Sequence, residues 1–375
     1  MRDISLILLA AGNSTRFGLP VKKQWLYQGD IPLWQYVANN FSSYYNFSQI
    51  VIVGNKNELK LMKKFANFTF VEGGDSRQES LTNALSKIKS DFVLVNDVAR
   101  CCVESTLVSN LIKKAKVGSC VTPAIKVNDT TYFESKPIER EKLLRVQTPQ
   151  LSCTKTLKEL LKSAKEFTDE SSLFFSANKE VIFTEGSKSA EKLTYKDDLQ
   201  LLTCLKKPLN EPRVGFGIDI HAFEENKKMY LCGVEIDSTL GFKAHSDGDV
   251  AIHALIDALL GAASLGDIGE LFPDTSSKFK DIDSKELLKE VVNLIKGVGY
   301  KIINCDISIV AQKPKILPYK EKMSRKLSEI LDISESRLNI KATTAEKLGF
   351  VGRAEGVTVY ATATLNYYNW GQHEN

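Results

Sequence analysis

The chain has 375 residues, of which 43% are hydrophobic and 26% are charged, and its formal net charge is +4. This composition is typical of an ordinary soluble globular protein. The small net charge, with no basic run interleaved with aromatic residues, argues against a nucleic-acid-binding protein. At about 150 residues per domain, the length predicts two or three domains.

In the first part of the chain, short apolar runs at residues 4–11, 49–54, 68–73 and 91–97 predict strands. Amphipathic segments at residues 57–66, 77–88 and 105–116 predict the helices between them. Apolar strands that alternate with helices indicate an α/β fold with a doubly wound, mainly parallel sheet of the Rossmann-like kind. Residues 130–150, rich in β-branched and charged side chains, predict a projecting hairpin or arm.

Residues 203–213 carry two prolines among charged neighbours and predict a linker. We therefore expect one domain over residues 1–207 and an α+β domain over residues 208–375. Its expected strands are residues 213–223, 229–236, 301–312, 337–344 and 355–368. Its expected helices are residues 249–265, 284–300 and 318–332.

The cysteines and the N-terminal segment bear on the cellular location. The seven cysteines are odd in number, scattered and without a CxxC pair, which indicates buried thiols in a reducing compartment rather than a disulfide framework. The apolar run at residues 4–11 is short for a signal peptide and is better explained as a buried strand. No other run is long enough to span a bilayer, so we expect a cytoplasmic protein without a membrane-spanning segment.

The sequence contains only four histidines, and three of them are His221, His245 and His253. Asp219 and His221 alternate on an expected strand, so their side chains point to the same side. His253 lies in the first turns of the following helix, for which Ser246 or Asp247 is the expected N-cap. One aspartate and two histidines suit zinc with a fourth position open for a substrate oxygen. The alternative is a His253 packed in the core and an Asp219 that bonds locally.

A second group of candidates follows the first strand. The small residues Ala10, Ala11 and Gly12 leave room for a phosphate chain at the backbone, and Arg16 with Lys22 or Lys23 would neutralise its charge. The segment is neither a Walker P-loop nor a GxGxxG fingerprint, and an ordinary strand-to-helix turn is the alternative. Asp97 ends a strand at the edge where open α/β sheets bind ligands, and a carboxylate there is a natural Mg²⁺ ligand. Arg100 follows as a further substrate-binding candidate.

The segments GFGIDIHAF, AHSDGDVAIHALIDALLGAASLGDIGELFPD and NIKATTAEKLGFVGRAEG resemble the 2-C-methyl-D-erythritol 2,4-cyclodiphosphate synthase family, over residues 213–368. The resemblance implies that a phosphorylated CDP-methylerythritol is cyclised with release of CMP. It implies zinc binding by Asp219, His221 and His253, catalytic substrate-side positions for His245 and Asp247, and a catalytic Glu346 that holds Mg²⁺. The implied substrate contacts and trimer-channel positions are Asp267, Lys315, Thr344, Phe350 and Arg353.

The segments AAGNSTRF, KKQWL, EGGDSRQES, NDVAR, NDTT, LLRVQTPQ, FTDESS and AEKLTYKDDL resemble the 2-C-methyl-D-erythritol 4-phosphate cytidylyltransferase family, over residues 1–205. The resemblance implies attack of methylerythritol phosphate on CTP with release of pyrophosphate. It implies that Arg16 and Lys23 stabilise the transition state and that Asp97 holds Mg²⁺. The implied cytidine-pocket residues are Gly74, Asp75 and Ser80, and the implied methylerythritol-phosphate residues are Thr130, Arg140, Thr148, Thr168 and Lys192.

Two departures from the second family pattern concern the phosphate loop. Ser14 stands where a glycine is usual, and VKKQ replaces the usual PKQ. The second departure leaves Lys22 or Lys23 as the catalytic lysine, and the spacing to Gln24 favours Lys23.

Together these features predict a bifunctional enzyme of the non-mevalonate isoprenoid pathway, whose two reactions are separated by a kinase step. Its partners would be small-molecule substrates and further copies of itself. The resemblance implies dimer contacts, with Thr130 and Arg140 reaching across from the arm, and trimer contacts, which a hexamer would satisfy together. The alternatives are a different nucleotidyltransferase, such as a sugar-nucleotide or ribitol-phosphate cytidylyltransferase, and a non-catalytic scaffold that binds CDP compounds and zinc.

Overall fold

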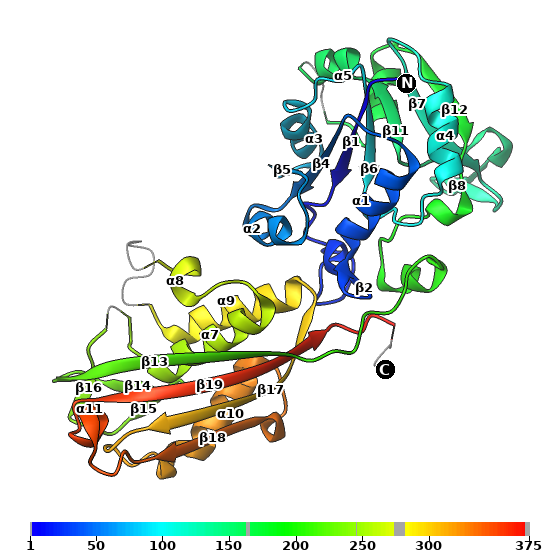
Figure 1. The fold of residues 1–375 in the computed structure, drawn as a ribbon. Helices are drawn as coiled ribbons and strands as arrows, with labels where there is room; N and C mark the ends of the chain where they lie inside the picture. The colour runs from blue at the N-terminus through cyan, green and yellow to red at the C-terminus, as the bar shows by residue number, and fades with distance from the viewer. Residues whose placement is uncertain (1, 163–165, 245, 274–281, 372–375) are drawn as a thin grey trace. The chain divides into compact units, whose positions relative to one another are not determined.

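The computed structural model describes residues 2–162, 166–244, 246–273 and 282–371 (Figure 1). The chain forms two compact units, Met1–Pro208 with Asn369–Asn375, and Leu209–Tyr368. Of the described residues, 369–371 thus group with the first unit, whereas the predicted second domain included them. Trp370 explains this, because its ring is buried and its Nε1 donates a 2.8 Å hydrogen bond to the carbonyl of Tyr27.

The first unit is built on an eight-stranded sheet in the order β10-β7-β11-β6-β1-β4-β5, with β12 paired to β7. Its strands are β1 (Ile4–Leu9), β4 (Gln49–Gly54), β5 (Thr69–Glu72), β6 (Phe92–Asp97), β7 (Cys120–Lys126), β10 (Leu144–Val146), β11 (Gln150–Cys153) and β12 (Val181–Glu185). β6, β1, β4 and β5 run parallel, while β11 is antiparallel to β6 and β7. The predicted mainly parallel α/β sheet is confirmed.

The helices of this unit are α1 (Leu33–Tyr44), α2 (Lys56–Phe65), α3 (Arg77–Leu85), α4 (Ser105–Lys113), α5 (Thr154–Leu161) and α6 (Glu170–Ser176). The amphipathic pattern predicts α2, α3 and α4, whereas α1, α5 and α6 were not among the predicted helices. α1 has no side-chain N-cap and is rich in aromatic, serine and asparagine residues of modest helix propensity. Packing of its buried face, which includes Trp34 and Phe41, therefore decides that it is helical.

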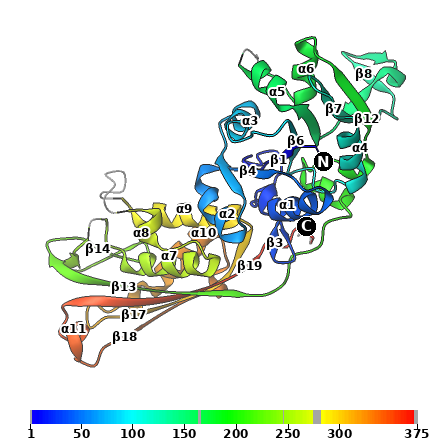
Figure 2. The same ribbon diagram turned by 45° about the horizontal axis from the view of Figure 1, so that its top comes forward.

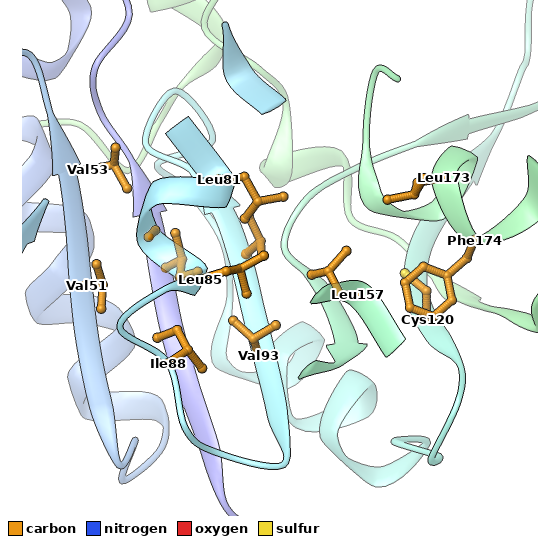
Figure 3. Packing of buried hydrophobic residues seen from close by; sticks show 13 residues of the cluster. Val51, Val53, Leu81, Leu85, Ile88, Val93, Cys120, Leu157, Leu173 and Phe174 are labelled. Atoms are coloured by element: carbon orange, nitrogen blue, oxygen red, sulfur yellow. The ribbon is translucent and has the colours of Figure 1, made fainter. Parts of the chain in front are cut away.

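Helix α3 packs on the central strands of the sheet (Figure 3). Leu81 and Leu85 lie against the valines of β4 and β6, among them Val51 and Val93, and all four side chains are buried. Leu157, Leu173 and Phe174 continue the same core over Cys120 of β7. This packing fixes the strands, and hence the positions of the loops at their carboxyl ends.

Residues 131–146 form the predicted arm. It contains the hairpin β8 (Thr131–Phe133) and β9 (Lys136–Ile138), followed by β10, which pairs with β7. Tyr132, Phe133 and Leu144 are exposed on it. A short hairpin, β2 (Tyr27–Gln28) and β3 (Ile31–Pro32), completes the strands of this unit.

The expectation of free thiols throughout is corrected by one pair. Cys102 and Cys204 form a disulfide whose Cα atoms lie 5.6 Å apart. It joins the segment after β6 to the start of the linker, which the linear spacing of cysteines does not reveal. The other cysteines, Cys101, Cys120, Cys153, Cys232 and Cys305, are free and buried.

The second unit has a five-stranded sheet in the order β16-β13-β19-β17-β18. Its strands are β13 (Arg213–Glu225), β16 (Leu240–Phe242), β17 (Tyr300–Val310), β18 (Leu338–Thr343) and β19 (Gly356–Tyr367). Its helices are α7 (Val250–Ala263), α8 (Ile268–Leu271), α9 (Ser284–Gly297), α10 (Lys320–Leu331) and α11 (Gly349–Gly352). Helices α7, α9 and α10 lie on one face of the sheet (Figures 1 and 2).

Two sequence-based details of this unit are wrong. Residues 229–236 form not one strand but a hairpin, β14 (Met229–Leu231) and β15 (Val234–Ile236), because Cys232 and Gly233 turn the chain with φ values of 51° and 74°. The N-cap of α7 is Asp249 rather than Ser246 or Asp247. Its buried carboxylate accepts the backbone N–H of Ile252 and also those of Cys232 and Gly233.

The alternation of β13 explains how α7 meets the sheet. Gly215 and Gly217 face α7, and a Cβ atom at either position would lie 2.0 or 2.1 Å from a backbone carbonyl of that helix. The missing side chains let α7 approach closely. Since side chains on a strand alternate, Asp219 and His221 point to the same face as the two glycines. The close approach therefore brings residues of α7 within reach of both.

Candidate functional sites

The first site is a cavity of about 620 Å³ at the carboxyl ends of β1 and β6. It is lined by the loop that follows β1, by the start of α3 and by Lys192. Ten predicted site residues line it together: Ala10, Ala11, Gly12, Arg16, Lys23, Gly74, Asp75, Ser80, Asp97 and Lys192. The edge of the sheet thus collects residues that are far apart in the sequence, as the parallel topology requires.

Ser14, which replaces the usual glycine, adopts the left-handed conformation with φ 58°. Its Oγ accepts a 2.9 Å hydrogen bond from the backbone N–H of Lys23. A left-handed conformation is costly for a residue other than glycine, and this side-chain hydrogen bond offsets part of that cost. Ser14 therefore ties the tip of the loop to the segment that carries the two lysines.

The two lysines have different surroundings. Lys22 forms an ion pair with Glu58, whose carboxylate is buried and also accepts a 2.6 Å hydrogen bond from Trp25 Nε1. Lys23 lines the cavity, and its Nζ donates a 3.2 Å hydrogen bond to the carbonyl of Leu193. Burial, together with the charges of Lys192 and Arg16, lowers the pKa of Lys23.

Asp97 lies at the centre of a buried charge network. Its Oδ2 is 2.5 Å from Lys192 Nζ and its Oδ1 is 3.2 Å from Arg77 Nε. Arg77 also donates to both carboxylate oxygens of Glu170, at 2.8 and 3.4 Å, and the Glu170 side chain is fully buried. Burial alone raises the pKa of Asp97, but the facing cations Arg77 and Lys192 outweigh it and lower that pKa to about 2. The carboxylate is therefore ionised at neutral pH.

The remaining predicted residues of the first unit do not line the cavity. Thr148 is buried beside it, and its Oγ1 accepts the backbone N–H of Asp97 at 3.3 Å. Arg100 donates to the carbonyl of Ala190 at 2.6 Å. The hydroxyl oxygen of Thr168 lies 3.4 Å from the hydroxyl oxygen of Ser172. Thr130 and Arg140 are exposed on the arm, where Arg140 donates to the carbonyl of Asn128 at 2.8 Å.

The second site is formed by β13 and α7. His253 Nδ1 lies 3.1 Å from Asp219 Oδ2, and His221 Nδ1 lies 3.2 Å from the same oxygen. One ligand atom of each of these three residues lies within 4.8 Å of the other two. His221 Nδ1 is buried, and its geometry gives it no hydrogen-bond partner within the described part of the chain. Burial alone would raise the pKa of Asp219, but the two imidazoles that face its carboxylate, His221 and His253, hold that pKa well below its ordinary range.

This donor set fits a divalent metal ion. A carboxylate and two imidazoles are borderline ligands that suit zinc, and three protein ligands are the number with which a catalytic zinc site keeps a fourth position for substrate. An orphaned ring nitrogen next to a shared carboxylate oxygen is costly without a cation to receive it. The predicted convergence of Asp219, His221 and His253 is therefore observed in the fold.

The second ring nitrogen of His253, Nε2, faces two serines from other segments of the chain. It lies 3.0 Å from Ser284 Oγ, at the start of α9, and 3.5 Å from Ser246 Oγ. Ser284 Oγ donates to Asp247 Oδ1, and the Ser284 backbone N–H donates to Asp247 Oδ2 at 3.1 Å. Both oxygens of Asp247 are thus occupied. His245 lies outside the described residues.

Other predicted residues of the second unit are spread over its surface, on loops and at the short helix α11. Asp267 caps α8 through the backbone N–H of Glu270 at 2.8 Å, and Thr344 Oγ1 donates to Glu346 Oε1 at 2.5 Å. Lys315 and Phe350 are exposed, and Arg353 forms an ion pair with Glu355. No contact within the described residues joins this group to Asp219.

Sequence reasoning did not select Arg77, Glu170, Glu58 or Ser284. Arg77 and Glu170 lie within the segments EGGDSRQES and FTDESS, but the family resemblance of these segments implies no function for either residue. Ser284 begins an ordinary amphipathic helix, and nothing in the linear pattern relates it to a histidine 31 residues earlier. These residues became visible only through their contacts.

The fold and the two sites define a two-domain enzyme that acts on nucleotide phosphates. A model of the 2-C-methyl-D-erythritol 4-phosphate cytidylyltransferase family matches residues 4–205, and a model of the YgbB family matches residues 212–366. The bifunctional enzyme IspD/IspF of Sulfurovum sp. is 54% identical over 99% of this chain and 100% of its own length. The enzyme of the same name from Campylobacter concisus is 52% identical, with the same coverage of both chains.

A solved structure agrees with these matches. The bifunctional IspDF from Campylobacter jejuni aligns with a TM-score of 0.90 and 49% identity, covering 99% of this chain and 100% of its own. The chain belongs to the bifunctional IspD/IspF family. It catalyses CTP-dependent cytidylyl transfer and cyclodiphosphate formation in non-mevalonate isoprenoid synthesis, which confirms both resemblances and sets aside the alternative activities. In the described part of the chain, no helix has the length and apolar character needed to cross a membrane.

Proposed function

We propose that the cavity of the first unit binds CTP with its triphosphate on the loop after β1. The support is the set of cations Arg16, Lys23 and Lys192 that line this cavity beside small residues. At Ala10, Ala11 and Gly12, phosphate oxygens can approach the backbone closely. Gly74, Asp75 and Ser80 line the same cavity and suit the cytidine end of the nucleotide.

In the transfer, an oxygen of methylerythritol phosphate attacks the α-phosphorus of CTP and pyrophosphate leaves. Negative charge grows on the oxygens of the reacting phosphates, and Arg16 and Lys23 stabilise it. Asp97 holds Mg²⁺, which when bound neutralises part of the triphosphate charge. Lys192 offers a further positive charge next to Asp97.

We assign binding of the acceptor substrate to Thr130, Arg140, Thr148, Thr168 and Lys192, and Arg100 remains a further substrate-binding candidate. Thr148 is the best supported, because its hydroxyl contacts the backbone of Asp97 beside the cavity. Thr130 and Arg140 stand on the exposed arm, so they would act on a second copy of the chain. The exposed arm residues Tyr132 and Phe133 supply apolar surface for such a dimer.

In the second unit, Asp219, His221 and His253 hold zinc or a similar divalent ion. That ion, when bound, would supply Lewis-acid polarisation of a phosphate oxygen of the substrate 4-diphosphocytidyl-2-C-methyl-D-erythritol 2-phosphate. In the cyclisation, the distal phosphate attacks the β-phosphorus and CMP leaves. His245 and Asp247 precede His253 in the sequence by eight and six residues. Both carboxylate oxygens of Asp247 accept hydrogen bonds from Ser284, so Asp247 suits a positioning function better than proton transfer.

The remaining substrate contacts of the cyclase are the exposed residues Asp267, Lys315 and Thr344, together with Glu346 as the carboxylate for Mg²⁺. They belong to surface loops, so we propose that they complete the site in an oligomer. Phe350 and Arg353 would line its central channel. The exposed face of β13, with Val214 at 68% and Phe216 at 60% exposure, supplies the apolar surface. Dimer and trimer contacts together would give a hexamer.

We place the enzyme in the cytoplasm, where its substrate CTP is made.

The convergence of Asp219, His221 and His253 is the observation that carries this proposal. Two assays on one preparation test it: pyrophosphate release from CTP with methylerythritol phosphate, and CMP release from the cyclase substrate. Metal analysis of the same protein should find stoichiometric zinc that is lost in His253→Ala. Full CMP release by a preparation free of divalent ions would contradict the proposal.

A further inference from the structure

Ser284, on helix α9, contacts the His253 ring on the side away from Asp219 and His221, where the metal ion is proposed to bind. Ser284 is fully buried, and its Oγ is 3.0 Å from His253 Nε2. The other ring nitrogen of His253, Nδ1, faces Asp219 Oδ2 at 3.1 Å. The imidazole is thus held between the metal-binding carboxylate and the hydroxyl of Ser284.

The direction of these hydrogen bonds follows from counting protons. The Asp247 carboxylate receives the backbone N–H groups of Ser284 and Asp249, at 3.1 and 3.2 Å, and acts as an acceptor. A serine hydroxyl has one proton, and the Ser284 hydroxyl donates it to Asp247 Oδ1. Its oxygen can therefore only accept from His253 Nε2, which must carry a hydrogen.

A neutral imidazole has one N–H, so a protonated Nε2 leaves a lone pair on Nδ1. That is the nitrogen that faces Asp219 and His221, where the metal is proposed to bind. The opposite tautomer would place its hydrogen on Nδ1, pointing at Asp219 Oδ2, and would block metal coordination. Ser284 disfavours that tautomer because it offers an acceptor to Nε2–H.

We propose that Ser284 is a positioning residue that holds His253 in the tautomer and orientation needed to bind the metal ion, with Asp247 fixing the direction of the Ser284 hydroxyl. The proposal rests on the metal site proposed above. Partners of this kind on the far nitrogen of a metal-binding histidine contribute about 10- to 100-fold to metal affinity. Ser246 Oγ, at 3.5 Å from Nε2, is a weaker second partner because it also accepts the Gly248 N–H at 3.1 Å.

The test measures zinc affinity of the full-length chain by competition with a chromophoric chelator after removal of metal. Ser284→Ala should weaken zinc binding by about 10- to 100-fold, whereas Ser284→Thr, which keeps the hydroxyl, should restore most of the affinity. Cobalt(II) bound to the alanine variant should show an altered visible spectrum, because the imidazole is no longer held. Cytidylyl transfer by the first unit should stay unchanged and reports that the chain is folded.

Ser328→Ala is the matched control. Ser328 is also buried on a helix of the same unit, but its hydroxyl donates to the carbonyl of Arg325 and not to a metal ligand. Zinc affinity should be unchanged in this variant. If Ser284→Ala cannot be purified, Ser284→Cys fills the same space with a poor hydrogen-bond partner and must show the same loss.

The outcomes separate two failures. The proposed metal site is wrong if the wild-type chain does not bind zinc, or if the His253→Ala variant binds zinc as tightly as the wild type does. If His253→Ala loses zinc but Ser284→Ala binds it like wild type, only the function of Ser284 is wrong. An equal loss in Ser328→Ala would likewise overturn the proposal, because it would indicate a general packing defect.

Discussion

Lys192 Nζ lies 2.5 Å from Asp97 Oδ2, so the carboxylate proposed to hold Mg²⁺ is neutralised by a lysine 95 residues later in the sequence. Arg77 contacts the other carboxylate oxygen. The two cations keep Asp97 ionised in a buried setting where a lone carboxylate would take up a proton. The same three residues line the cavity, so the charges that stabilise Asp97 are also available to a nucleotide.

Asp97→Asn should strongly lower the rate of cytidylyl transfer and leave cyclisation intact. The amide cannot supply the negative charge for a metal ion, and we expect a decrease of about 100-fold or more in kcat. Pyrophosphate release measures the first reaction and CMP release the second. His253→Ala is the reciprocal control and should lose only CMP release. A variant at either position that loses both activities would indicate misfolding or coupling between the units.

The two adjacent lysines should behave differently. Lys23→Ala should lower cytidylyl transfer strongly with little change in stability, because Lys23 lines the cavity. Lys22→Ala should instead lower the free energy of unfolding by about 1 to 3 kcal/mol, because it leaves the buried Glu58 carboxylate without its cation. Steady-state kinetics and denaturant unfolding of both variants distinguish the two. If the Lys22→Ala and Lys23→Ala variants lost the same amount of activity and had the same free energy of unfolding, this assignment would be wrong.

The pH dependence of cytidylyl transfer should report the lowered pKa of Lys23. The ammonium binds phosphate only when charged, so kcat/KM for CTP should fall as pH rises through this pKa. Because burial and two neighbouring cations lower it, the fall should begin below the ordinary lysine value of 10.5. Lys23→Arg keeps its charge to higher pH and should move the fall upward. An unchanged profile in that variant would assign the titration to another group.

Arg77 should be important for stability as well as for transfer. Arg77→Ala removes the only cation that contacts Glu170 among the described ion pairs, and Glu170 is fully buried. Breaking a buried pair in this way costs about 3 to 5 kcal/mol. Glu170→Gln in the Arg77→Ala background should recover part of that loss, since the buried charge is then removed. Denaturant unfolding measures both, and no recovery in the double variant would argue against the charge explanation.

The exposed face of β13 should control assembly. Phe216→Asp places a charge on the outward side of the strand, away from α7, and should shift the chain to smaller oligomers. Light scattering coupled to size-exclusion chromatography measures the change. Glu225→Gln, at the end of the same strand, is the control and should leave the mass unchanged. A wild-type chain that is already monomeric would contradict the proposed oligomer.

Much of both candidate sites was predictable, because their residues lie on or directly after strands. The apolar runs and the alternation of side chains in these strands are visible in the sequence. The alternation around Asp219 and His221 and the apolar run before Asp97 each place a polar group at a defined point. The family resemblance then added functions to these positions. Helix α1 and the β14–β15 turn were not predictable in this way, because packing and left-handed backbone at Cys232 and Gly233 determine them.

By itself, the sequence determined the α/β and α+β character of the two units, the arm, and the aspartate and histidines of the candidate metal site, because periodicity and local residue types carry this information. Tertiary structure alone decided which cation neutralises Asp97 and which hydroxyl contacts His253, and it placed Lys23, the lysine that the spacing to Gln24 favours, in the cavity. Those contacts join residues from separate elements, and their distances depend on packing such as the close approach of α7 to Gly215 and Gly217. No pattern along the chain encodes that proximity directly.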